Sequence, residues 1–222
     1  MIAALSGDKN MLSAFKNNED IHLKTAAAIF GKSEKDISKD ERRAAKTINF
    51  GVIYGMGAHS LAEATKMSYG QAQDFISKYF IFFSGVKKYL DNTKKQAGET
   101  GYVQTFFGRK RNIAEINSGM SQVRNAAERM AINMPVQGTA ADIMKLAMLK
   151  VHEAIKTKYL NNCQMLLQVH DELVLEIKED QVKKITQDLK NIMENIPECE
   201  PLGVKFIAEA EVGDNWEDME KI

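Results

Sequence analysis

Four side chains at four-residue intervals, Arg42, Lys46, Phe50 and Tyr54, are the first group in this sequence that could bind a ligand. On an α-helix this spacing keeps side chains on one face, with a drift of about 40° per step. The face would present two cations followed by two rings. Arg and Lys match phosphate oxygens, and aromatic faces stack on a base or sugar. The order predicts a ligand with a polyanionic tail and a flat head, which is the shape of a nucleoside triphosphate.

A simpler interpretation treats Arg42 and Lys46 as solvated charges and the two rings as core. The neighbouring Asn49, Gly51 and Gly55 argue against it. A glycine inside a helix costs about 1 kcal/mol relative to alanine, and it is tolerated best where another group must approach the backbone closely. We therefore favour a ligand-binding helix.

A second candidate group lies between two apolar runs, in residues 168–173 with the sequence QVHDEL. Two-residue hairpin turns prefer Gly-containing pairs, and this junction contains no glycine. The adjacent carboxylates Asp171 and Glu172 at a hairpin tip would suit Mg²⁺, which favours carboxylates together with substrate phosphates and water. The alternative is an exposed acidic turn in which His170 is incidental.

Helical signals dominate the first hundred residues, which must position the first group. Asp20 can cap a helix running to Phe30. Capping boxes are expected at Ser38 with Glu41, opening the helix that carries the four side chains, and at Ser68 with Gln71. Glycines are expected to end helices at these positions: Gly31, Gly55, Gly85 and Gly101.

The second half mixes helices with strands. Alternation predicts a short hairpin around Gly108 and a buried antiparallel hairpin of residues 165–169 and 173–177. Helices are expected over residues 120–133 and 136–158, separated by Pro135, and over residues 180–196. Residues 205–212 predict a last strand. Few strands with grouped helices indicate an α+β architecture, with a helical lobe followed by a small antiparallel sheet.

Composition narrows the classes of partner. The 222 residues are 44% hydrophobic and carry 30 basic against 30 acidic side chains, so no bulk field draws the chain to nucleic acid or membrane. No apolar run approaches the roughly 18 residues that span a bilayer, so we expect a cytoplasmic protein without a membrane partner. Cys163 and Cys199 lack the spacing of zinc ligands.

Residues 42–55, RRAAKTINFGVIYG, resemble motif B of the family A DNA polymerases, and residues 168–173 resemble motif C. Bacterial DNA polymerase I typifies this family. The resemblance continues through residues 20–22, 128–133, 135–142 and 213–216, so it covers essentially the whole chain. Order and spacing both agree with the family.

The resemblance implies the right-hand polymerase fold, with fingers in residues 1–120 and the C-terminal part of the palm in residues 121–222. It implies nucleotide binding by His22, Arg42, Lys46, Phe50 and Tyr54. It implies Asp171 and Glu172 as Mg²⁺ ligands that act in catalysis with Lys46. It further implies primer–template contacts by Arg129, Asn133, Gln137 and His170.

One family feature, motif A, is missing from this sequence. Its Asp would be the second carboxylate of the two-metal site, and the match begins just after the segment that carries it. We therefore expect a split or truncated polymerase whose upstream fragment supplies motif A and the thumb. Two alternatives remain open: a non-catalytic nucleotide- and nucleic-acid-binding module, or a fragment similar to a single-subunit RNA polymerase. A viral source would place the protein in the host-cell cytoplasm.

Overall fold

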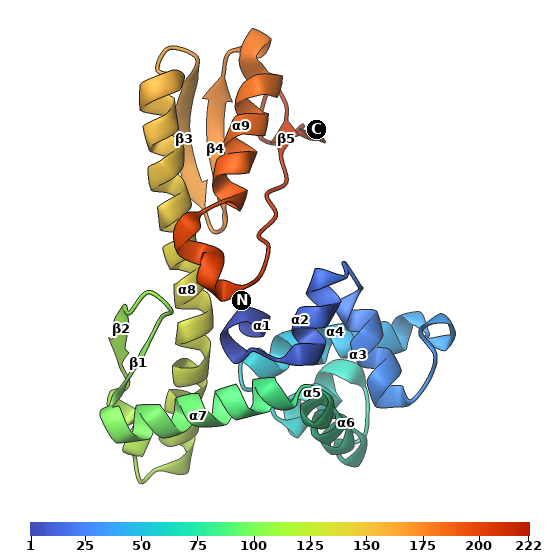
Figure 1. Cartoon of the computed structure of the whole chain (residues 1–222). Coiled ribbons are helices and arrows are strands. Elements are labelled where there is room, and N and C mark those ends of the chain that lie inside the picture. The colour runs from blue at the N-terminus through green and yellow to red at the C-terminus, as the bar shows by residue number, and fades with distance from the viewer. The chain divides into compact units, whose positions relative to one another are not determined.

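The computed structural model describes the backbone of residues 1–222 and all side chains except those of residues 52 and 53. The chain divides into two compact units, Met1–Thr139 and Ala140–Ile222 (Figure 1). The elements of the first unit are α1 (Ile2–Ser6), α2 (Lys9–Lys16), α3 (Ile21–Phe30), η1 (Glu34–Asp36), α4 (Lys39–Ile53), α5 (Ala58–Thr65), α6 (Tyr69–Phe82), α7 (Ser84–Thr100), β1 (Tyr102–Gln104), β2 (Lys110–Asn112) and η2 (Ala114–Asn117).

Helix α8 (Ser121–Lys158) begins in the first unit and continues into the second. The second unit also contains β3 (Cys163–Val169), β4 (Glu172–Ile177), η3 (Glu179–Gln181), α9 (Val182–Glu194), η4 (Pro197–Leu202), β5 (Glu211–Val212) and β6 (Glu220–Lys221). Helices dominate, and the strands form small antiparallel pairs. The predicted α+β class is confirmed.

The expected helix caps of the first unit are present. The Asp20 carboxylate accepts hydrogen bonds from the backbone N–H groups of His22 and Leu23 at the start of α3. Both reciprocal bonds of the Ser38–Glu41 capping box are made, and so are those of the Ser68 box. Each cap satisfies N–H groups that have no acceptor within the helix. Together these caps fix where α3, α4 and α6 begin.

Gly85 does not end a helix, so that prediction is wrong. It lies in the first turn of α7, where its N–H donates to Asp8 Oδ2 at 2.8 Å. A Cβ on Gly85 would lie 2.8 Å from the Asp8 Cα atom. The Asp8 carboxylate also caps α2 by accepting from Met11 N at 3.0 Å. Glycine is needed here because two helix starts meet at one buried carboxylate.

Helix α8 is continuous through Pro135, and the predicted break there is wrong. Proline removes one backbone donor and normally kinks or ends a helix. Here Ala131, Ile132, Met134 and Val136 are all buried around it. We attribute the continuity to this apolar packing, which outweighs the local preference of the residue before proline.

The second unit packs one face of the β3–β4 hairpin against helices. Its core includes Val151 from α8 and Ile185 and Leu189 from α9. The antiparallel pairing is as predicted. The hairpin is not buried on both faces, however, because Leu166 and Leu167 are each 49% exposed at a bulge in β3. The expectation of a buried hairpin is therefore wrong for the described chain.

The predicted strand over residues 205–212 is reduced to β5, which pairs with β6 at the chain end. Residues 205–209 have no strand partner in the described chain, although their apolar residues alternate as in a strand, and the Ala210 carbonyl accepts from Ile222 N just beyond β6. Alternating apolar residues give a strand an apolar face, but only a neighbouring strand supplies its hydrogen bonds.

Cys163 and Cys199 are both buried, free thiols. Among the described residues, no helix is long and apolar enough to cross a membrane.

Candidate functional site

Helix α4 presents the predicted stripe of side chains on its outer face. Arg42, Lys46 and Phe50 are exposed, whereas Ala45 and Ile48 are buried against the core of the first unit. Phe50 is 53% exposed, which rules out the interpretation of this ring as a core residue. The helix therefore offers two cations and a ring to solvent, in the predicted order.

Tyr54, the fourth member of the stripe, lies just beyond the last residue of α4. Its N–H donates to the Gly51 carbonyl at 3.0 Å, and its ring is exposed. Gly55 follows with a φ of 74°, in the left-handed region that favours glycine. A Cβ on Gly55 would lie 2.6 Å from Arg129 Cγ. The turn after α4 thus lies directly against the Arg129 side chain.

The group that approaches Gly51 closely belongs to this chain. A Cβ on Gly51 would lie 2.5 Å from the sulfur of Met56, and Met56 N donates to the Gly51 carbonyl at 2.8 Å. The glycine therefore accommodates the turn that leads from α4 to α5. Packing by Met56 accounts for Gly51 without a ligand at that position.

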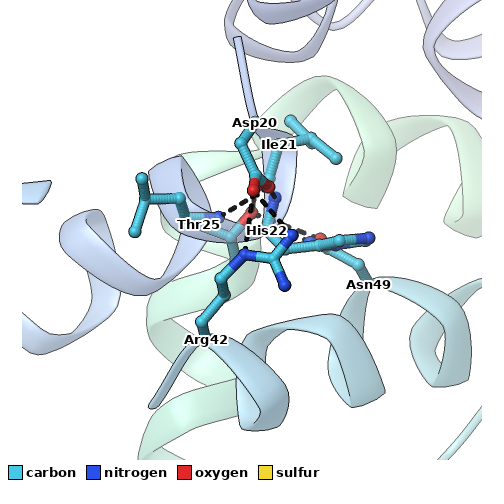
Figure 2. Close-up of polar contacts among 7 residues, drawn as sticks. Asp20, Ile21, His22, Thr25, Arg42 and Asn49 are labelled. Carbon is cyan, nitrogen blue, oxygen red and sulfur yellow. Dashed lines mark hydrogen bonds and ion pairs between the residues drawn. The ribbon is translucent and has the colours of Figure 1, made fainter. Parts of the chain in front are cut away.

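Arg42 is held by a carboxylate from the neighbouring helix start. Its Nε and Nη2 atoms donate to Asp20 Oδ2 at 2.8 and 2.6 Å (Figure 2). Burial alone would raise the pKa of Asp20, but hydrogen bonds from Arg42 and from the backbone N–H groups of Leu23 and His22 hold it below its ordinary value. Asp20 is thus both the cap of α3 and the anchor of Arg42.

His22 lies beside the stripe, with its ring centroid 5.7 Å from that of Phe50. Its Nδ1 atom is 2.9 Å from Asn49 Nδ2. Burial lowers the pKa of His22, Asp20 opposes this effect, and the charges of Arg42 and Lys46 lower the pKa further. The ring is therefore mainly neutral at pH 7. The contact between His22 and Asn49 is not evident from local sequence patterns, although a polar Asn beside buried Ile48 is a signal for it.

The acidic pair lies at the tip of the β3–β4 hairpin. Val169 pairs with Glu172, so His170 and Asp171 form the two-residue turn. His170 has a φ of 52°, a left-handed conformation that is uncommon outside glycine, and its carbonyl accepts from Gln168 Nε2 at 2.6 Å. His170, Asp171 and Glu172 are exposed. The turn therefore presents both carboxylates to solvent at the end of a hydrogen-bonded pair of strands.

Three polar side chains, Arg129, Asn133 and Gln137, follow one another at four-residue intervals along α8. Because the helix continues through Pro135, this row stays on one side. Asn133 Oδ1 is a buried atom without a hydrogen-bond partner among the described residues. Arg129 connects the row to the turn after α4. Contact with nucleic acid by these residues remains a prediction.

The nucleotide candidates and the row on α8 belong to the first unit, and the acidic tip belongs to the second. In the described part of the chain, no group of three or more His, Cys, Asp or Glu side chains is arranged to hold a metal ion. Asp171 and Glu172 would thus be a partial ligand set.

Comparison with known proteins identifies the family. Residues 1–218 match the family described as DNA polymerase family A. This chain belongs to that family. The family A assignment rests on nearly the full chain, as does the similarity to individual members.

Among its relatives, the chain is 45% identical over 216 residues to the thermostable DNA polymerase I of Thermus filiformis. It is 44% identical over 218 residues to DNA polymerase I of Pseudomonas aeruginosa. These matches cover 97% and 98% of the chain but 25% and 23% of the relatives. The chain therefore spans about a quarter of their length.

A solved structure also matches this family A chain. It is the POL domain of Pol1 from M. smegmatis in complex with DNA primer-template and dNTP, with a TM-score of 0.84 and 39% identity. The match covers 92% of this chain and 35% of the other. The division into fingers over residues 1–120 and palm over residues 121–222 remains a prediction. It differs from the compact units, whose boundary at residues 139 and 140 lies within α8.

Proposed function

We propose that this chain is the C-terminal portion of a DNA-templated DNA polymerase, and that it binds an incoming dNTP, primer–template DNA and Mg²⁺. The observation that carries the proposal is the exposed stripe on α4 with His22 beside it. The related polymerase domain from M. smegmatis is in complex with primer-template and dNTP, which supports the same two ligands here. Family membership favours DNA synthesis over the RNA polymerase alternative.

The stripe assigns parts of the nucleotide to different residues. Arg42 and Lys46 bind the phosphates, with His22 as a further donor. Phe50 and Tyr54 contact the sugar and base, since both rings are exposed at the end of α4. Because Nε and Nη2 of Arg42 each donate to Asp20, the N–H groups left for a phosphate are the two on Nη1 and the second on Nη2. Lys46 also stabilises the charge that develops on the phosphates during transfer.

The hairpin tip fits a magnesium ion. Asp171 and Glu172 offer exposed carboxylate oxygens, and Mg²⁺ is usually held by one or two carboxylates together with water and substrate phosphates. A bound Mg²⁺ would neutralise charge on the reacting phosphate and activate the attacking oxygen. Asp171 serves as the principal ligand, Glu172 lies beside it, and His170 contacts the primer end. Transfer needs a motif A carboxylate, which we assign to an upstream polymerase fragment that also carries the thumb.

The row on α8 would contact DNA. Arg129, Asn133 and Gln137 can reach the minor groove of the newly formed duplex, where donors meet base acceptors that are shared by all sequences. Clustered cations bind phosphates locally even when the net charge is zero. The alternative function is a binding module that keeps these contacts without catalysis.

Substitution of Asp171 tests the catalytic proposal. In the enzyme completed with the upstream fragment, Asp171→Ala should abolish primer extension and leave primer–template binding intact, because a metal ligand acts on the chemical step. Asp180→Ala, which removes one exposed negative charge from the same unit, is the matched control and should extend normally. Extension at the wild-type rate by Asp171→Ala would contradict the catalytic role of Asp171 and favour the alternative of a non-catalytic binding module.

Lys46→Ala should lower kcat and raise KM for dNTP together.

A further inference from the structure

A buried polar cluster connects α3 to α4 beneath the stripe. Thr25 on α3 is fully buried, and Asn49 on α4 is 7% exposed. Asn49 Nδ2 lies 3.1 Å from Thr25 Oγ1 and 2.9 Å from His22 Nδ1 (Figure 2). Buried polar groups are costly without partners, so the arrangement of donors and acceptors in this cluster is restricted.

The Thr25 hydroxyl determines how the Asn49 amide is oriented. A hydroxyl has one hydrogen, and the shortest contact of Thr25 Oγ1 is to the Ile21 carbonyl at 2.6 Å. With that hydrogen committed, Oγ1 acts as an acceptor and needs an N–H from Asn49. Both amide positions of Asn49 lie within range of Thr25 Oγ1, at 3.1 and 3.3 Å, and the shorter one is the better position for the donating NH₂ group. An oxygen placed there would lie against an Oγ1 atom whose only hydrogen is already used. The Asn49 NH₂ group therefore faces Thr25 and His22.

This orientation determines the tautomer of His22. The second N–H of the Asn49 amide points to His22 Nδ1, so Nδ1 must accept a hydrogen bond. A neutral imidazole with an accepting Nδ1 carries its proton on Nε2. The charged groups that act on this ring are Asp20 at the start of α3 and Arg42 and Lys46 on α4. Burial and the two cations lower the pKa of His22, which supports a neutral ring.

We infer that Asn49 and Thr25 are positioning residues that hold His22 as a neutral Nε2–H donor to a phosphate oxygen of the nucleotide. The phosphate part of this inference rests on the proposed function. In this arrangement Arg42 and Lys46 supply the positive charge, and His22 supplies a directed hydrogen bond. Holding the ring neutral also avoids a third cation in the partly buried space beside them.

The tautomer can be measured in the ligand-free chain by ¹⁵N NMR of its histidines. The chain has 4 histidines, and the His22→Gln variant assigns the His22 signals. We expect an Nδ1 shift typical of an unprotonated acceptor and an Nε2 shift typical of N–H, with one tautomer dominant at pH 7 to 8. A wild-type ring with the proton on Nδ1, or an even mixture of tautomers, would overturn the inference without any variant.

A matched pair of variants tests the role of Thr25. Thr25→Val removes the hydroxyl with little change in volume, whereas Thr25→Ser retains it. Thr25→Val should give a mixture of His22 tautomers, because the amide of Asn49 is no longer oriented, and Thr25→Ser should keep the single wild-type tautomer. Asn49→Asp replaces the donor by an acceptor of the same size and should raise the pKa of His22 by at least one unit, a tenfold gain in proton affinity. Unchanged tautomers in Thr25→Val would contradict the inference.

Inorganic tripolyphosphate tests the link to phosphate binding. Thr25→Val should bind it several-fold more weakly than wild type at pH 7.5, and Thr25→Ser should bind it equally well. Equal binding by Thr25→Val, with its tautomers mixed, would show that His22 does not donate to phosphate. A wild-type chain that binds neither tripolyphosphate nor dNTP would contradict the proposed function, while the NMR result would still decide the role of Asn49 and Thr25.

Discussion

At the scale of single residues, Asp20 combines two contacts that substitution can separate. Asp20→Ala removes both the α3 cap and the ion pair with Arg42. Asp20→Asn keeps a good capping side chain and loses only the ion pair. We expect Asp20→Ala to lower the free energy of unfolding by about 1 kcal/mol, and Asp20→Asn by a few tenths, because exposed ion pairs contribute little. Urea unfolding at pH 7 measures both values, and equal losses would contradict this separation.

The Asp20 carboxylate also predicts a dependence on pH. Its pKa in the folded chain is below the ordinary value, so folding favours the ionised form. The resulting stability is fully present above the ordinary carboxyl pKa of about 4 and is lost as the pH falls through the lowered pKa. Asp20→Asn should lose less stability than wild type between pH 5 and pH 2. Parallel pH profiles of unfolding would contradict this expectation.

Phe50 allows a test of the stripe at one ring. A phenyl ring has no hydroxyl to replace an interaction made by the 3′-OH of a nucleotide, so dideoxynucleotides should be used poorly. Phe50→Tyr supplies a hydroxyl, and one recovered hydrogen bond is worth roughly 1 to 3 kcal/mol. In the completed enzyme, the ratio of kcat/KM for ddNTP to that for dNTP should rise by about one to two decades. An unchanged ratio with full activity would mean that Phe50 does not face the sugar.

At the scale of elements, features that depend on neighbouring residues in the sequence could be predicted, and features that depend on tertiary packing could not. The caps at Asp20, Ser38 and Ser68 were predicted because each depends on residues within three positions of the helix start. The continuity of α8 through Pro135 depends on apolar packing that no local pattern reveals. The stripe follows from spacing alone. The contact of His22 with Asn49 joins residues 27 positions apart and required the tertiary structure.

Two glycines of helix α7 give a matched prediction. Alanine is favoured over glycine in a helix by about 1 kcal/mol. At Gly98 a Cβ would meet only Asn117 Oδ1, at an ordinary 3.5 Å, so Gly98→Ala should stabilise the chain. At Gly85 a Cβ would lie 2.8 Å from the Asp8 backbone, so Gly85→Ala should destabilise it by about 1 to 3 kcal/mol. Chemical denaturation compares the two, and stabilisation by Gly85→Ala would show that the Asp8 contact is dispensable.

At the scale of the whole molecule, we expect this chain alone to extend primers negligibly with dNTPs and Mg²⁺. Two-metal transfer needs ions held about 3.5 to 4 Å apart by ligands on more than one element. Asp171 and Glu172 lie together at one hairpin tip, and no group of three or more His, Cys, Asp or Glu side chains among the described residues could hold a metal ion. Adding a polypeptide that carries motif A and the thumb should restore extension, and the same mixture made with Asp171→Ala should remain inactive. Robust extension by the chain alone, persisting after repurification, would contradict this view.

The burial of both cysteines makes the molecule suitable for site-specific labelling. Burial raises the pKa of the Cys163 thiol and of the Cys199 thiol, so little reactive thiolate is present at neutral pH. A cysteine introduced at an exposed position, such as Lys39 at the start of α4, would react with a maleimide dye far faster than either native thiol. One fluorophore could then report movement of the helix that carries the stripe, without first removing the natural cysteines.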